Sequence, residues 1–166
     1  MYGGSQKIVS MKKLDHVDKQ ILQILQEDGR IPYTEIAQQL GVSEGTIRAR
    51  ITRLLQDGVF QFVIHPDPEK LGLHVQAIIG LTTKLGSQKY VAEELSKFSA
   101  VRFVGSFSGK HDLILQACFH SNDELITFVN ERLSQIEGIV AADVSLELKQ
   151  YKDSFSFVQD DDVTLQ

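Results

Sequence analysis

Three arginine residues lie close together in the first third of the chain, at Arg48, Arg50 and Arg53. Glu44 is the one acidic residue within residues 43–53, so three positive charges against one negative charge give this segment a local charge of +2. A guanidinium group can pair with a guanine edge or with a phosphate oxygen. The segment therefore indicates a DNA-binding surface. The alternative is a small helical bundle whose cationic helix faces only solvent.

The spacing around these arginines predicts a helix-turn-helix over residues 34–57. We expect Thr34 to cap a helix over residues 35–40 and Gly41 to end it in the left-handed conformation. Ser43 is expected to cap the next helix, which would lie in the major groove with its N-terminal residues near the base edges. The residues predicted to contact DNA are Tyr33, Thr34, Ser43, Glu44, Thr46, Arg48, Arg50 and Arg53.

An amphipathic helix is predicted before this motif. Asp15 can cap it, and Asp18 follows three residues later, near the positive end of the helix dipole. Ile21 and Leu25 recur at helical spacing. Residues 11–64 are thus expected to form one helical, winged-helix-like DNA-binding domain.

The second half of the chain alternates between strand and helix patterns. Strands are predicted over residues 74–84, 101–107, 113–119 and 140–149, with helices over residues 91–98 and 125–136. The order βαββαβ with right-handed crossovers predicts a ferredoxin-like antiparallel sheet with both helices on one face, so the fold class is α+β.

Five segments follow from these patterns. They are a flexible leader (1–10), the helix-turn-helix domain (11–64), a proline-containing linker (65–74), the ferredoxin-like domain (75–152) and an acidic tail (153–166).

The second face of the predicted sheet is also apolar. Ile78 and Gly80 on the first strand, and Ile114 and Cys118 on the third, point away from the face that the helices cover. A monomer would expose this surface to water, so we predict a homodimer at least.

The composition fits an acidic globular protein. The 166 residues carry a net charge of −5, part of which comes from Asp160, Asp161 and Asp162 in the tail. The one cysteine, Cys118, excludes an internal disulfide framework and a zinc site made of cysteines alone. No apolar run approaches the roughly 20 residues of a membrane-spanning helix, and residues 1–10 lack the apolar core of a secretory signal. We therefore expect a soluble, cytoplasmic protein without a membrane partner.

Several motifs resemble those of the Lrp/AsnC, or feast/famine, family of bacterial and archaeal regulators. The patterns LDxxDxxIL, DGR, EIAxxLGVS and RxxRLxxDGV follow one another over residues 14–59. PEKLG in the linker and SGKHD, which is similar to the family's GxxD turn, extend the resemblance over about residues 12–152. The combination is specific, whereas a helix-turn-helix alone would not be.

The resemblance implies a transcription regulator of amino-acid metabolism genes that has no cofactor and binds an amino acid or a related metabolite as effector. It also implies dimers formed through the C-terminal sheets, and in many members octamers of four dimers. The implied effector-binding residues are Ser108, Gly109, Lys110, His111 and Asp112. Lys110 could pair with a carboxylate and Asp112 could accept from an ammonium group. The structural alternative is a plain hairpin turn.

Two positions depart from the family pattern. His111 stands where the family often has tyrosine, and Ala142 and Val144 stand where it often has two threonines near the ligand. Lost hydroxyl groups mean lost hydrogen bonds, so either the effector differs from that of other members or none binds. The histidine is either a pH-sensitive group or a turn residue.

Two other functions share these features. Siroheme decarboxylases resemble the same regulators, and His111 and Arg102 are the residues that would contact a tetrapyrrole; the arginine-rich helix argues against this enzyme. No nucleophile motif, phosphate loop or metal-ligand spacing is present in the sequence. An architectural protein that wraps DNA would differ from a regulator only in how strongly it discriminates between sequences.

Overall fold

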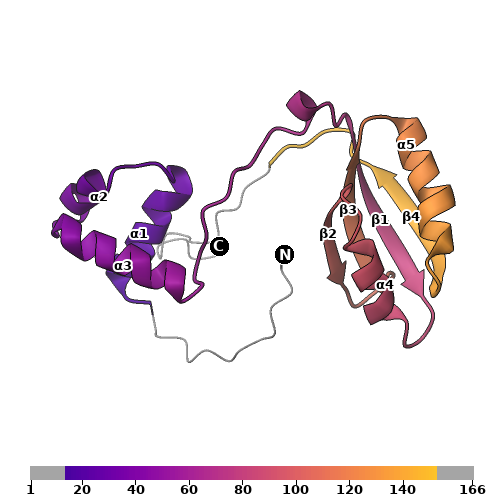
Figure 1. Ribbon diagram of the computed structural model, residues 1–166, viewed down its shortest axis with the longest axis horizontal. Helices are drawn as coiled ribbons and strands as arrows, with labels where there is room; N and C mark the ends of the chain where they lie inside the picture. The colour runs from indigo at the N-terminus through magenta and orange to yellow at the C-terminus, as the bar shows by residue number, and fades with distance from the viewer. Residues whose placement is uncertain (1–13, 153–166) are drawn as a thin grey trace, which may run out of the picture. The chain divides into compact units, whose positions relative to one another are not determined.

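The computed structural model describes residues 14–152, so the predicted leader and acidic tail lie outside the described residues. Over that range the chain forms two compact units, residues 14–64 and residues 65–152 (Figure 1). In the described part of the chain, no helix is long and apolar enough to cross a membrane.

The first unit is a bundle of three helices. They are α1 (His16–Glu27), α2 (Tyr33–Leu40) and α3 (Glu44–Gln56). One apolar residue from each helix is fully buried, at Ile21, Ile36 and Ile47, and these side chains meet in a single core. Burial of this shared core holds α3 against the other two helices, because an amphipathic helix is stabilised mainly by packing its apolar face.

The helix ends follow the sequence signals, with one exception. Ser43 caps α3 by accepting a 3.1 Å hydrogen bond from the Thr46 N–H, and Gly41 ends α2 with a φ of 66°. The prediction that Thr34 caps α2 is wrong, because the helix already begins at Tyr33 and its N-cap is Pro32. The fixed φ of proline suits a helix start, and the Pro32 carbonyl accepts from the helix without any side-chain cap.

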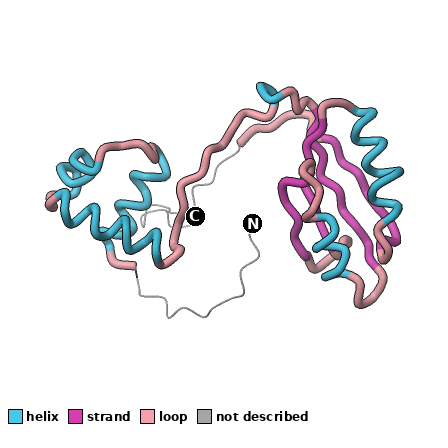
Figure 2. The backbone as a smooth tube through the Cα atoms, in the orientation of Figure 1, coloured by secondary structure: helices cyan, strands magenta, loops and turns pink. Residues whose placement is uncertain are grey.

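The second unit has the predicted ferredoxin-like fold. Its strands are β1 (Val75–Thr83), β2 (Val101–Ser106), β3 (Leu113–Phe119) and β4 (Ile139–Leu146), and its helices are α4 (Gln88–Leu95) and α5 (Asn122–Thr127). The sheet order is β2-β3-β1-β4, with every neighbouring pair antiparallel (Figure 1). Figure 2 shows the strands of this sheet in magenta and the helices in cyan. A π-helical turn (Phe128–Arg132) and a 3-10 turn (Leu133–Gln135) continue α5, and a further 3-10 turn (Glu69–Leu71) lies within the predicted linker.

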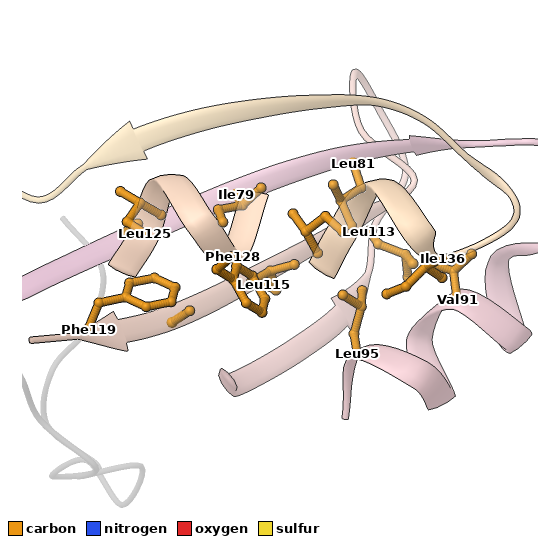
Figure 3. Close-up of a cluster of buried hydrophobic side chains, with 13 residues drawn as sticks. Ile79, Leu81, Val91, Leu95, Leu113, Leu115, Phe119, Leu125, Phe128 and Ile136 are labelled. Atoms are coloured by element: carbon orange, nitrogen blue, oxygen red, sulfur yellow. The ribbon is translucent and has the colours of Figure 1, made fainter. Parts of the chain in front are cut away.

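Both helices pack on the same face of this sheet. Ile79 and Leu81 alternate along β1 toward a fully buried cluster that also contains Val91 and Leu95 of α4 and Phe128 after α5 (Figure 3). Residues on alternate positions of a strand point to opposite faces. The remaining face, which we call the open face, is therefore free of helices.

The open face combines apolar and polar side chains. Ile78 on β1 is 47% exposed and lies opposite Gln116 of β3, while Gly80 lies opposite Ile114. On the edge strand β4, Val144 pairs with Ile79 and so points to the helix side, yet it remains 38% exposed. The two helices thus cover the central strands more completely than the β4 edge.

Candidate functional site

The predicted recognition helix α3 has one buried side and one exposed side. Ile47, Ile51 and Leu54 are buried against the bundle. The exposed positions of the helix are Gly45, Thr46, Arg48, Ala49, Thr52, Leu55 and Gln56. Most of these are small or polar side chains, which allow a helix to approach the floor of a major groove closely.

Arg48 lies on this exposed side with two of the predicted DNA-binding residues beside it. Its side chain is 63% exposed, and its guanidinium donates to the Glu44 carboxylate at 2.6 Å. The same guanidinium lies over the Tyr33 ring, 5.3 Å from the ring centre. An exposed i,i+4 ion pair contributes only about 0.3–0.5 kcal/mol, so a phosphate or a base can replace Glu44 as partner.

The predicted hydroxyl contacts lie at the starts of α2 and α3. The Ser43 hydroxyl caps α3 and lies 2.9 Å from the hydroxyl of Thr46. Ser43, Thr46 and Thr34 are all exposed. Hydroxyls and backbone N–H groups at a helix N-terminus commonly contact DNA phosphates, so these positions suit that role.

Arg50 and Arg53, two further predicted DNA contacts, have acidic partners within the helical bundle. Arg50 donates to the carboxylates of Asp15 at 2.6 Å and of Asp18 at 2.8 Å. Arg53 donates to the other oxygen of Asp18 at 2.5 Å. The local charge of +2 that the sequence suggested is therefore balanced by two aspartates at the start of α1.

Sequence reasoning assigned these two aspartates only to the cap of α1. The structure contains that cap: the Asp18 N–H donates to Asp15, and the Asp15 N–H donates to Asp18. The Asp18 side chain is only 2% exposed, and a buried carboxylate needs cationic partners. The Arg50 guanidinium, together with the Asp18 N–H, holds the pKa of Asp15 below its ordinary value.

The predicted effector residues form the hairpin between β2 and β3, which we call the 108–112 hairpin. Ser108 and Gly109 are exposed, and Gly109 has a φ of 137°. Asp112 turns inward, where its carboxylate accepts from the N–H of Thr83 at 2.7 Å and from the hydroxyl of Thr83 at 3.1 Å. The carbonyl of Asp112 also accepts from the Gln88 side chain. These bonds hold the hairpin to the end of β1 and the start of α4.

Lys110 and His111 turn toward the open face. The Lys110 ammonium donates to Asp143 of β4 at 2.7 Å, and His111 Nε2 lies 3.6 Å from the same carboxylate oxygen. The Lys110 ammonium is the main cause that lowers the pKa of Asp143 below its ordinary value. His111 Nδ1 is buried and has no hydrogen-bond partner within residues 14–152.

The structure thus brings the hairpin residues together but aims their side chains in two directions. Thr83, Gln88 and Asp143 complete this region, and no local pattern in the sequence indicates them because they lie on other elements. Ala142 and Val144, the positions of the missing threonines, point to the face of β4 opposite to Asp143. No group of His, Cys, Asp and Glu side chains in the described residues could hold a metal ion.

Both units of the chain are similar to domains of known proteins. The model of the AsnC-type helix-turn-helix domain matches residues 14–55, and that of the Lrp/AsnC ligand binding domain matches residues 76–157. An uncharacterised HTH-type transcriptional regulator of Pyrococcus horikoshii is 38% identical over 135 residues, covering 81% of this chain and 85% of the relative. The HTH-type transcriptional regulator LrpA of the same species is 32% identical over 140 residues, which cover 84% of this chain and 99% of the relative.

Solved structures agree with these matches. A Neisseria meningitidis transcriptional regulator in complex with L-Met superposes with a TM-score of 0.82 at 28% identity, covering 87% of this chain and 96% of that one. AsnC of Escherichia coli, at 24% identity, shares the fold with a TM-score of 0.80, covering 85% of this chain and 96% of that one. The chain therefore belongs to the Lrp/AsnC family of DNA-binding transcriptional regulators.

Proposed function

We propose that this regulator reads DNA sequence with the exposed side of α3 and that Arg48 makes a base contact. The observation that carries this proposal is the difference between the three arginines. The Arg48 side chain is 63% exposed and has one solvent-exposed partner, whereas those of Arg50 and Arg53 are 26% and 38% exposed and bind a buried carboxylate. Ser43, Thr46 and Thr34 would hold the adjacent phosphates.

The test compares Arg48→Ala with the unchanged protein on two duplexes. One duplex carries a preferred site selected from a random-sequence pool, and the other has a scrambled sequence. A base contact is worth about 1–3 kcal/mol of discrimination, so the ratio of the two Kd values should fall by about fivefold or more. An equal loss of affinity for both duplexes would instead assign Arg48 to a phosphate and leave specificity to other residues.

The chain should act as a homodimer at least, with octamers of four dimers as the larger assembly. Exposed apolar residues on the open face, Ile78 among them, support this proposal because a second copy of the sheet would cover them. Ile78→Lys should shift the mass measured by light scattering toward the monomer, whereas Ile126→Lys, an exposed position on α5, should leave it unchanged. A monomeric mass for the unchanged protein at micromolar concentration would contradict the proposal.

An amino acid or a related metabolite is the proposed effector, bound at the 108–112 hairpin. The match to a ligand-binding domain and the L-Met complex of a structural relative support this assignment. The exposed backbone of Ser108 and Gly109 is available to a ligand carboxylate, and the Lys110 ammonium could exchange its exposed partner Asp143 for the same group. Asp112 is already bonded to Thr83, so we expect it to shape the hairpin as well. A thermal-shift screen of amino acids that starts with L-methionine tests this, and no shift with any of them would favour a ligand-independent regulator.

We further infer that the protein acts in the cytoplasm as a regulator of amino-acid metabolism and not as an enzyme. The curated relatives reported above are transcriptional regulators, which supports this view. A purified protein that carries a pigment with a Soret band would instead favour the siroheme decarboxylase alternative.

A further inference from the structure

We propose that Asp18, assisted by Asp15, sets the DNA selectivity of α3 by neutralising Arg50 and Arg53 and keeping their guanidinium groups from DNA phosphates. In this view the two aspartates restrain sequence-independent binding, so that contacts on the exposed side of the helix decide which DNA is bound. The inference rests on DNA binding by α3. It adds a role for Asp15 and Asp18 at the start of α1, which need not touch DNA themselves.

The charged residues Asp15, Asp18, Arg50 and Arg53 form one compact cluster. Both oxygens of Asp18 are occupied by guanidinium groups, Oδ1 by Arg50 and Oδ2 by Arg53. Asp15 takes a second bond from the same Nη1 atom of Arg50. Two positive and two negative charges thus cancel within a cluster whose central carboxylate is 2% exposed.

The three arginines of α3 do not share one side of the helix. Successive residues of an α-helix are rotated by about 100°, so Arg50 lies about 200° from Arg48, on the other side of the helix. Arg53 is three residues after Arg50 and therefore shares its side. The helix consequently carries one cation on its exposed side and two on the side that faces the start of α1.

Pairing of Arg50 and Arg53 with aspartates lowers the electrostatic attraction of α3 for DNA. Every lysine or arginine that reaches a DNA phosphate adds affinity for any sequence, because it releases a condensed counterion. Two free arginines in each helix-turn-helix would therefore raise non-specific binding and lower the ratio of specific to non-specific affinity. Arg50 and Arg53 are instead held by the buried carboxylate of Asp18. Their charges are therefore largely balanced, and they add little to the positive electrostatic potential that DNA meets. This also fits a chain whose net charge is −5 and whose discrimination cannot depend on a large basic surface.

A purely structural role for the cluster makes a different prediction. A buried ion pair is weak evidence for stability, and loss of one partner commonly destabilises a domain. If Asp18 served only to hold the bundle together, its replacement would weaken binding to all DNA and would not change how binding depends on salt. The salt dependence therefore separates the two roles.

The experiment measures binding of a scrambled duplex over a range of salt concentrations, for the unchanged full chain, Asp18→Asn and Asp15→Asn. Each added phosphate contact steepens the slope of log K against log salt concentration by about 0.9. We expect Asp18→Asn to steepen the slope by about one to two contacts per helix-turn-helix, and Asp15→Asn by less than one. In both variants the preference for a selected site should fall. An unchanged or shallower slope in a folded Asp18→Asn protein would overturn the proposal.

Two further variants complete the design. Asn is itself a good N-cap, so Asp15→Asn should keep α1 intact. This variant therefore still tests the proposal if Asp18→Asn does not fold. An unchanged salt slope in Asp15→Asn would then count against the proposal. Arg50→Gln and Arg53→Gln, added to Asp18→Asn, should return the slope to that of the unchanged protein. A slope that stays steep in this triple variant would also overturn the proposal.

The Arg48→Ala variant separates this result from failure of the base-contact proposal. Its effect on discrimination depends on the exposed side of α3 and should be the same in the presence and absence of the aspartates. A normal loss in Arg48→Ala with no slope change in Asp18→Asn would therefore reject only the role of Asp18.

Discussion

The imidazole ring of His111 lies directly against the backbone of Gly80, on the open face of the sheet. A Cβ atom built at position 80 would stand 2.5 Å from the Cδ2 atom of the ring. Gly80 is buried within β1, so its missing side chain provides the space in which the ring rests. Glycine in a strand interior often marks such a close approach.

Gly80→Ala should therefore destabilise the second unit. The new methyl group must displace the His111 ring, and overpacking of this kind costs about 1–3 kcal/mol in the free energy of unfolding. Urea denaturation at one fixed protein concentration measures the change. In a His111→Ala background the same substitution should be almost neutral, and an undiminished loss there would show that the ring is not the obstacle.

Asp112→Ala should also lower stability, through the end of β1. The substitution removes the acceptor of the partly buried Thr83 N–H, and an unsatisfied donor costs up to about 1–3 kcal/mol where it is fully buried. Asp112→Asn keeps an oxygen that can accept from the Thr83 N–H, so it should lower the free energy of unfolding by less. Ser108→Ala, on the exposed tip of the same hairpin, is the matched control and should change the unfolding free energy by no more than about 0.5 kcal/mol. Similar values for Asp112→Ala and Ser108→Ala would contradict this account.

Replacing two glycines of the helix-turn-helix by alanine should change the stability of the domain in opposite directions. Gly41 has a φ of 66°, where a side chain is strained by about 1–2 kcal/mol, so Gly41→Ala should lower the midpoint of thermal unfolding. Gly45 lies in α3 with negative φ, and an added Cβ would meet only the Ser43 Oγ atom at an ordinary contact distance of 3.8 Å, so Gly45→Ala should raise the free energy of unfolding by up to about 0.5–1 kcal/mol. Calorimetry of the two variants checks the pair, and a change of the same sign in both would show that backbone conformation is not the deciding factor.

The Lys110–Asp143 pair should contribute to stability at neutral pH and lose that contribution in acid. Because Lys110 lowers the pKa of folded Asp143 below its ordinary value of 3.8, the contribution is present above about pH 3.8 and is lost as the pH falls through the folded pKa. An NMR titration should show this pKa rising toward 3.8 in Lys110→Met. Lys89→Met, which removes a partner of Glu93 on α4, should leave the titration of Asp143 unchanged. No rise in Lys110→Met would mean that the pair does not persist in solution.

Local signals in the sequence were enough for most of the fold. The caps at Asp15 and Ser43 and the glycine after α2 are determined by residues within four positions of one another, so they could be predicted from spacing. Alternation of apolar residues along β1 and β3 likewise predicted which face the helices cover. The error at Thr34 arose where two start signals compete, since Pro32 also fits a helix N-terminus.

The parts of the site that escaped prediction are contacts between distant residues. Arg50 and Asp18 are 32 residues apart, and Lys110 and Asp143 are 33 apart. Residue type shows that an arginine can bind a phosphate or a carboxylate but does not show which one it meets. Helical spacing already separates Arg50 from Arg48 on α3, but only the packing of α1 against α3 shows that Arg50 meets Asp15 and Asp18.

Asp18 belongs to two structures at once, since it completes the cap of α1 and accepts from two arginines of α3. During synthesis α1 leaves the ribosome well before α3, so its first turn exists for a time without the cations that its carboxylate requires. We expect this turn to become fully ordered only when the third helix docks. The three helices should consequently fold in one cooperative step, and a chain interrupted before Arg50 should leave the beginning of α1 frayed and open to degradation.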